Sequence, residues 1–96
     1  MKTQTVKVSG KNNKHKVLMY AISTCGWCKR AKKFLNDNNV EYEYVDVDLC
    51  NQEDKNKIRQ DIQSRGGPLA YPTIIIDNQT LLTGAPQHKL KEVLEI

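Results

Sequence analysis

Apolar residues change their spacing several times along this chain, and each spacing predicts a different element. Residues 16–22 form a continuous β-compatible run, which is typical of a central strand covered on both faces. Over residues 28–35 the apolar positions recur at helical spacing with basic residues between them, which predicts an amphipathic helix. Ser23 or Thr24 can cap the start of this helix, and the asparagine-rich stretch 36–39 is expected to end it.

The middle of the chain continues the alternation of strand and helix patterns. Residues 41–48 alternate strictly between apolar and polar, which predicts a strand. Asn51 is a good helix cap, and a thin apolar stripe of Ile58 and Ile62 follows it. The glycine pair at 66–67 is expected to end this second helix.

The last part of the chain reads as a hairpin followed by a helix. Residues 73–76 predict another buried strand, and the Asp-Asn pair at 77–78 makes a tight turn into a strand over 80–82. Pro86 suits the first position of a final helix. The inner face of that helix is expected to consist of Leu90, Val93 and Leu94.

The predicted order of elements is β-α-β-α-β-β-α, with an extra leading strand possible at 5–8. The polar stretch 9–14 allows that strand to form a hairpin with the next one. An early βαβ unit requires a parallel pair and a right-handed crossover, and the later hairpin adds an antiparallel pair. We therefore expect an α/β domain at 15–96, in three layers around a mixed four-stranded sheet, preceded by an N-terminal extension at 1–14.

Composition narrows the functional classes. The chain has 96 residues, which suits one domain, and carries a formal net charge of +4. Acidic residues are interspersed with the basic ones and no nucleic-acid motif occurs, so attraction to acidic proteins explains the charge better than nucleic-acid binding. The sequence has neither a signal-peptide pattern nor a stretch of transmembrane length, which predicts a soluble, cytoplasmic protein without a membrane partner. We expect it to be a monomer.

Two of the three cysteines form a Cys-x-x-Cys pair at the start of the first predicted helix. In a reducing cytosol such a pair is more often catalytic or metal-binding than structural. At a helix start, Cys25 lies among unsatisfied N–H groups that favour its thiolate, while Cys28 faces inward one turn later. Cys25 is thus the predicted nucleophile that attacks a disulfide, and Cys28 the thiol that resolves the mixed disulfide. Reversed, the same pair would oxidise dithiols.

A metal site is the competing interpretation of the pair. Tetrahedral zinc needs four ligands, and the remaining candidates, Cys50, His15 and His88, are scattered singly. We therefore expect neither a metal nor another cofactor. His15 and His88 read as surface residues, whereas Cys50 is expected near the active-site edge of the sheet. It is interpreted as a small buried apolar residue, with a third redox thiol or a cluster ligand as the alternative.

Two motifs in this order resemble those of the thioredoxin-fold redoxins. They are Cys-Gly-Trp-Cys at 25–28 between a strand and a helix, and Tyr-Pro-Thr at 71–73 before a strand. The chain looks most like the small glutaredoxin-like branch, which includes the redoxins that serve ribonucleotide reductase. The resemblance implies a thioredoxin fold with Pro72 in the cis form and the Tyr71 backbone, beside Thr73, pairing with substrate. Trp27 is expected to line the substrate groove.

The chain also departs from the glutaredoxin pattern. Residues 21–24 lack the basic residue that usually precedes the first cysteine, and 83–87 lack the Gly-Gly-acidic motif that grips glutathione. The expected substrate is therefore a protein disulfide, with ribonucleotide reductase as one target implied by the resemblance. The electron donor remains open between a flavin-dependent reductase, a ferredoxin-linked reductase and glutathione. An iron–sulfur cluster carrier of the glutaredoxin type is the alternative function.

Overall fold

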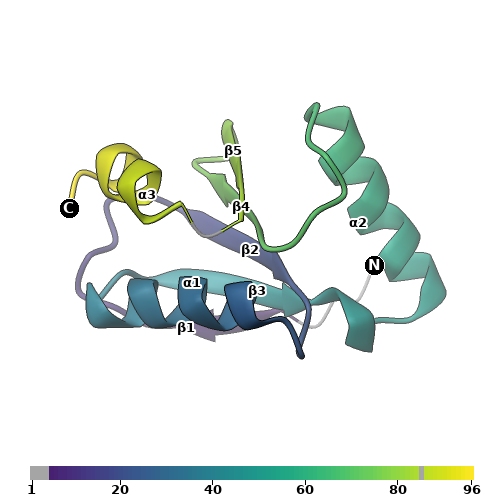
Figure 1. The fold of residues 1–96 in the computed structure, drawn as a ribbon, viewed down its shortest axis with the longest axis horizontal. Coiled ribbons are helices and arrows are strands. Elements are labelled where there is room, and N and C mark those ends of the chain that lie inside the picture. The colour runs from purple at the N-terminus through teal and green to yellow at the C-terminus, as the bar shows by residue number, and fades with distance from the viewer. Residues whose placement is uncertain (1–4, 85) are drawn as a thin grey trace.

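The computed structural model describes residues 5–84 and 86–96, which form a sheet flanked by helices (Figure 1). The N-terminal end of the predicted extension and Ala85 of the 83–87 segment lie outside the described residues. The elements in chain order are β1 (Val6–Val8), β2 (Val17–Ala21), α1 (Gly26–Asp37), β3 (Tyr42–Asp46), the short 3-10 helix η1 (Val47–Leu49), α2 (Gln52–Ser64), β4 (Thr73–Ile76), β5 (Thr80–Thr83) and α3 (Gln87–Leu94).

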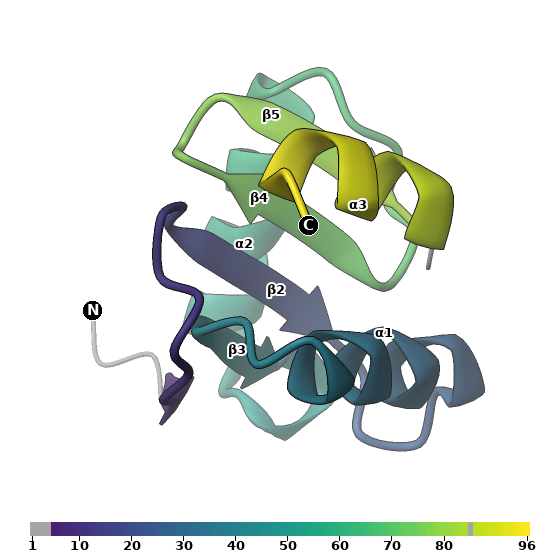
Figure 2. The same cartoon turned by 90° about the vertical axis from the view of Figure 1, so that its left-hand side faces the viewer.

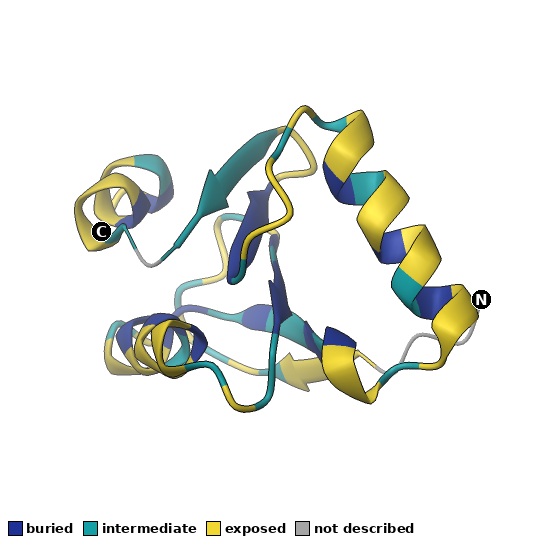
Figure 3. Cartoon of the chain, turned by 45° about the vertical axis from the view of Figure 1, so that its right-hand side comes forward, coloured by how far each residue is buried: buried dark blue, intermediate teal, exposed yellow. Residues whose placement is uncertain are grey.

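The strands form a mixed sheet in the order β1-β3-β2-β4-β5. β2 and β3 are parallel, and the other neighbouring pairs are antiparallel. The expected three-layer α/β arrangement is confirmed, because α1 and α3 cover one face of the sheet and α2 covers the other (Figure 2). Buried residues line both faces of β2 and β4, as expected for central strands (Figure 3).

The two faces of the sheet are packed differently. The side under α1 and α3 holds the larger cluster, in which Phe34 and Leu35 of α1 meet Leu90 and Leu94 of α3. The side under α2 holds a smaller cluster around Ile58 and Ile62. The thin stripe predicted for α2 is thus sufficient for one small core.

Polar contacts supplement the narrow apolar face of α2. The Tyr20 hydroxyl in the sheet donates to the Asp61 carboxylate of α2 over 2.7 Å. Arg65 donates to Asp61 over 3.0 Å and to the Asn78 side chain over 2.6 Å. This network joins α2 both to the central strand and to the β4–β5 turn.

The extra N-terminal strand exists, but its predicted pairing is wrong. β1 does not form a hairpin with β2; it pairs antiparallel with β3, with Val6 opposite Tyr44. The reason is that β3 and β4 already occupy the two edges of β2. The segment that connects β1 to β2 instead lies along the α1–β3 loop, where the Asn12 N–H donates to the Asn39 carbonyl over 2.8 Å.

Most of the predicted helix and turn boundaries are confirmed. Asn51 caps α2 by accepting from the Asp54 N–H over 2.8 Å. Asn38 ends α1, and Gly66 adopts a φ of +80° just after α2. Asp77 and Asn78 both have positive φ, and the Gln79 N–H donates to the Ile76 carbonyl over 3.1 Å, which closes the predicted tight turn. The loop has three residues, because Ile76 pairs with Thr80.

Two predicted helix starts are shifted. Cys25, rather than Ser23 or Thr24, is the N-cap of α1, since Ser23 is engaged by the Asp48 carboxylate instead. Pro86 is the N-cap of α3, so the first helical residue is Gln87. Both shifts are one or two residues in size.

Candidate functional site

The Cys-x-x-Cys segment lies where three elements meet. It follows the carboxyl end of β2 and opens α1. β4 runs antiparallel to β2, with Thr73 opposite Tyr20, so the segment that leads into β4 reaches the same end of the sheet. The fold thereby brings together two motifs that are more than forty residues apart, at positions 25–28 and 71–73.

Cys25 is positioned by the first turn of α1. As the N-cap it is partly exposed, and its sulfur accepts the Cys28 backbone N–H over 3.3 Å. The pKa of Cys25 is lowered, first by a hydrogen bond from the Cys28 thiol and then by the backbone N–H groups of Cys28 and Trp27, although partial desolvation opposes the shift. A lowered pKa raises the thiolate fraction near neutral pH, and the thiolate is the nucleophile.

Cys28 has the opposite environment. It has no solvent exposure, and its sulfur accepts the Ile22 backbone N–H over 3.4 Å. Burial is the main cause that raises its pKa to about 11. Cys28 therefore stays protonated while Cys25 ionises, and a substrate can reach only the Cys25 sulfur directly.

The Tyr-Pro-Thr segment lies beside the Cys25 thiol. The Tyr71–Pro72 peptide bond is cis, as the resemblance implied. The Cys25 sulfur lies 4.0 Å from the Tyr71 carbonyl oxygen. The Pro72 carbonyl accepts the Gly84 N–H over 2.9 Å, which ties this segment to the end of β5.

Thr73 and Trp27 occupy very different surroundings. The Thr73 side chain is fully buried, and its hydroxyl donates to the Ala70 carbonyl over 2.6 Å, so it shapes the segment from inside. Trp27 is 58% exposed, and the Arg30 guanidinium lies 4.9 Å from its ring centroid. Of the two, only Trp27 has a side chain that another molecule can contact.

An additional pair, Ser23 and Asp48, holds the loop before the nucleophile. One Asp48 oxygen accepts the Ser23 N–H over 2.9 Å, and the other accepts the Ser23 hydroxyl over 2.5 Å. These hydrogen bonds lower the pKa of the Asp48 carboxyl. Sequence reasoning missed the pair, although one signal was available: both residues follow parallel neighbouring strands, whose carboxyl ends share one edge of the sheet.

Cys50 does not share the core of the redox pair. It packs with the cluster under α2, whereas Cys25 packs with the cluster on the opposite face. Its sulfur lies 3.6 Å from the Asp46 carbonyl oxygen, and partial burial is the main cause of its raised pKa. A raised pKa makes this thiol a poorer nucleophile than Cys25 at neutral pH.

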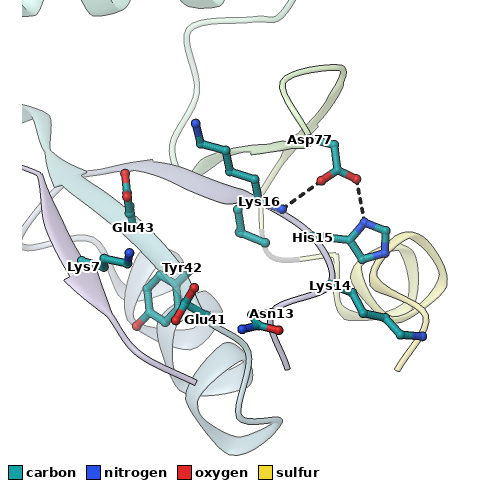
Figure 4. Close-up of a pocket in the computed structure, with 10 residues that line it drawn as sticks. Lys7, Asn13, Lys14, His15, Lys16, Glu41, Tyr42, Glu43 and Asp77 are labelled. Carbon is teal, nitrogen blue, oxygen red and sulfur yellow. Dashed lines mark hydrogen bonds and ion pairs between the residues drawn. The ribbon is translucent and has the colours of Figure 1, made fainter. Parts of the chain in front are cut away.

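The two histidines lie elsewhere. His88 is exposed on α3. His15 adjoins a pocket of about 420 Å³ at the amino end of β2, where it contacts Asp77 (Figure 4). Across residues 5–84 and 86–96, no three His, Cys, Asp or Glu side chains gather in a way that would hold a metal ion.

No helix in the described part of the chain has the length and apolar character needed to span a bilayer.

The sequence matches a family profile and several curated relatives. The profile of the glutaredoxin family matches residues 17–81. Glutaredoxin 1 of Rickettsia conorii is 38% identical over 64 residues, which make up 67% of this chain and 60% of the Rickettsia protein. A glutaredoxin-like 8.6 kDa protein from the rubredoxin operon of Clostridium pasteurianum is 29% identical over 79 residues, 82% of this chain and 97% of that protein. The match thus spans less than two thirds of the Rickettsia relative's length.

Solved structures agree with this assignment over nearly the whole chain. The glutaredoxin of Methanosarcina mazei superposes with a TM-score of 0.87 at 31% identity, covering 97% of this chain and 89% of that one. The methanoredoxin of Methanosarcina acetivorans has a TM-score of 0.82 at 33% identity, with 88% of each chain covered. The expected thioredoxin fold is confirmed by these neighbours.

Proposed function

The chain belongs to the glutaredoxin family, and from that premise we propose that it is a dithiol–disulfide oxidoreductase that reduces protein disulfides through Cys25 and Cys28. Family and fold support redox chemistry between thiols and disulfides in general. The observation that carries the specific proposal is the contrast between the partly exposed Cys25 sulfur at the start of α1 and the fully buried Cys28 sulfur one turn later, which displaces their pKa values in opposite directions. It provides one accessible nucleophile and one protected thiol.

The proposed reaction has two exchange steps. The Cys25 thiolate attacks one sulfur of the substrate disulfide, which breaks the S–S bond, releases one substrate thiolate and leaves a mixed disulfide. Cys28 then loses its proton and attacks the Cys25 sulfur. This forms the Cys25–Cys28 disulfide and releases the second substrate thiolate. Two electrons pass from the dithiol to the substrate, and the two released thiolates take up protons.

The surroundings of Cys25 suit an extended protein segment as substrate. The Tyr71 carbonyl lies beside the nucleophile and offers backbone hydrogen bonding to a peptide. The exposed ring of Trp27, two residues after Cys25, offers an apolar contact. The buried Thr73 supports the segment rather than touching the substrate.

The electron donor and the target complete the proposal. Residues 21–24 carry no basic side chain that could hold a glutathione carboxylate. We therefore favour a flavin- or ferredoxin-linked reductase as donor over glutathione, and a protein such as ribonucleotide reductase as target. In this scheme the chain acts as a monomer in the reducing cytoplasm.

The proposal is tested by trapping the first intermediate. Cys28→Ser should form a stable mixed disulfide with a protein substrate, because the resolving thiol is missing; mass spectrometry of adducts captured from a cell lysate measures this. Cys25→Ser should reduce insulin no faster than dithiothreitol alone, and turnover at the parent rate would refute the assignment. A visible spectrum of protein purified without oxygen serves as the control, because cluster absorption together with no insulin reduction would favour the iron–sulfur carrier instead.

A further inference from the structure

The positive charge of the molecule is concentrated on one side of the sheet. α1 has Lys29, Arg30, Lys32 and Lys33 against a single acid, Asp37, which gives it a charge of +3. α3 has two lysines against Glu92, which gives it +1. α2, on the opposite face, has three basic and three acidic residues and is neutral. The two helices on the Cys25 side thus together match the chain's formal net charge of +4.

A groove runs between the two positive helices. It has a volume of about 500 Å³ and is lined from α1 by Arg30, Lys33 and Phe34 and from α3 by Gln87 and Lys91. Phe34 is nearly buried and contributes an apolar base, while the three basic side chains are exposed. Asp37 also lines the groove, where it pairs with Lys33 over 2.8 Å. The charges of Lys33 and Asp37 cancel, so the side chains that line the groove carry a net charge of +2, from Arg30 and Lys91.

Arg30 links the groove to the segment that carries the two cysteines. Arg30 lines the groove, and its guanidinium lies 4.9 Å from the ring of Trp27, which sits between the two cysteines. Arg30 follows Cys25 by five residues, or roughly 8 Å along the helix axis. A peptide with its disulfide at Cys25 could therefore reach the groove with only a few extended residues.

We propose that this groove binds an acidic segment next to the disulfide of the protein that Cys25 reduces, an inference that rests on the proposed function. Cations on both walls favour an extended chain of carboxylates, and the apolar base accommodates an aliphatic side chain between them. Exposed charges of this kind mainly accelerate encounter and select the partner, and salt screens them. The groove is therefore a specificity determinant that lies outside the two thiol motifs.

The test compares three peptides of equal length that contain the same internal disulfide. They carry a short run of glutamate, glutamine or lysine beside it. The quantity measured is kcat/KM for disulfide reduction at about 10 mM and about 300 mM salt. We expect the glutamate peptide to be reduced about tenfold faster than the glutamine peptide at low salt, and this preference to shrink towards unity at high salt.

A pair of variants matched in charge locates the effect. Arg30→Glu/Lys33→Glu/Lys91→Glu should reverse the preference towards the lysine peptide. Lys7→Glu/Lys55→Glu/Lys57→Glu changes the net charge equally on β1 and α2, and it should retain most of the preference for glutamate. Equal rates for the three peptides, or equal losses in the two variants, would overturn the proposal.

Binding without turnover separates this proposal from the proposed function. Trp27 is the only tryptophan of the chain and lies beside the groove, so its fluorescence can report docking. Versions of the peptides with serine in place of cysteine should also be compared. The change in fluorescence should be largest with the glutamate peptide, smaller with the glutamine peptide and smallest with the lysine peptide. If this order appears and no disulfide peptide is reduced, the docking groove stands and the oxidoreductase function fails. A single-stranded DNA oligomer that binds more tightly than the glutamate peptide would contradict a protein partner.

Discussion

Cys25 and Cys28 have identical side chains, and their surroundings give them different chemistry. Cys25 receives hydrogen bonds at the helix start, which stabilise its negative charge. Cys28 is enclosed by the core, where a charge is costly, and so it remains a thiol that donates to Cys25. The spacing of the two residues along one helical turn allows this division of roles.

The pH dependence of alkylation should reveal this difference. In a Cys50→Ser background, we expect the rate of Cys25 alkylation by iodoacetamide to reach half its maximum at a pH clearly below the ordinary thiol value of 9.0. Cys28→Ala should move this midpoint upward, because the side chain that contributes most to the lowered pKa of Cys25 is lost, whereas Cys28→Ser retains a hydroxyl donor. A parent midpoint at 9.0 or above, or the same midpoint in all three proteins, would contradict this account of the site.

At the scale of elements, the N-terminal segment is fitted closely against the rest of the chain. β1 forms an edge of the sheet beside β3, and the backbone of Asn12 is bonded to both Asn39 and Glu41. Gly10 lies in the chain between β1 and Asn12. A Cβ atom at Gly10 would lie 2.4 Å from the Asn39 carbonyl oxygen and 2.7 Å from the Glu41 nitrogen. The close approach requires glycine because both obstacles are backbone atoms.

Gly10→Ala should therefore lower the free energy of unfolding by about 1–3 kcal/mol, the range typical of overpacking. Urea denaturation under reducing conditions measures this change in the free energy of unfolding. Gly26→Ala is the matched control, since a Cβ there meets no atom within 4 Å, and alanine suits a helix better than glycine. If Gly10→Ala is as stable as the Gly26→Ala variant, the N-terminal segment does not pack as described.

At the scale of the whole molecule, His15 joins segments that are far apart in the sequence. Its Nδ1 lies 2.6 Å from an Asp77 oxygen in the β4–β5 turn, and its Nε2 lies 3.1 Å from a Glu95 oxygen after α3. The other Asp77 oxygen accepts the Lys16 N–H over 2.8 Å (Figure 4). These contacts hold the residues just before β2 against the β4–β5 turn and against the segment that follows α3.

The contribution of His15 to stability should depend on pH. Hydrogen bonds to Asp77, and then to Glu95, raise the pKa of His15 above its ordinary 6.5. The folded state therefore binds the proton more tightly, so this stabilisation is complete below pH 6.5 and is lost as the pH rises through the higher folded value. We expect His15→Gln to be less stable than the parent at pH 6, and the gap to narrow by about pH 9.

Urea denaturation of the parent and His15→Gln at both pH values measures the gap. Because the cysteines are present in both proteins, their titration cancels in the comparison. A gap that stays the same, or that widens as the pH rises, would show that protonated His15 does not fasten these segments.

Much of the fold followed from local patterns. The apolar run at 16–22 and the helical spacing at 28–35 predicted β2 and α1, because the period of apolar residues reflects which sides of an element are buried. The positions of the two thiols were predictable for the same local reason, since a Cys-x-x-Cys that opens a helix places one sulfur at the helix end and the other one turn inside.

Other features depended on contacts between distant residues. β1 pairs with β3 because both edges of β2 are occupied, which is a property of the assembled sheet. The Ser23–Asp48 pair, the partners of His15 and the groove between α1 and α3 likewise join positions that are 25 to 80 residues or whole elements apart. The sequence alone thus determined the elements and the contrasting surroundings of Cys25 and Cys28, because these depend on neighbours along the chain. Only the tertiary structure decided the order of the strands and the surface around Cys25, because packing brings those distant residues together.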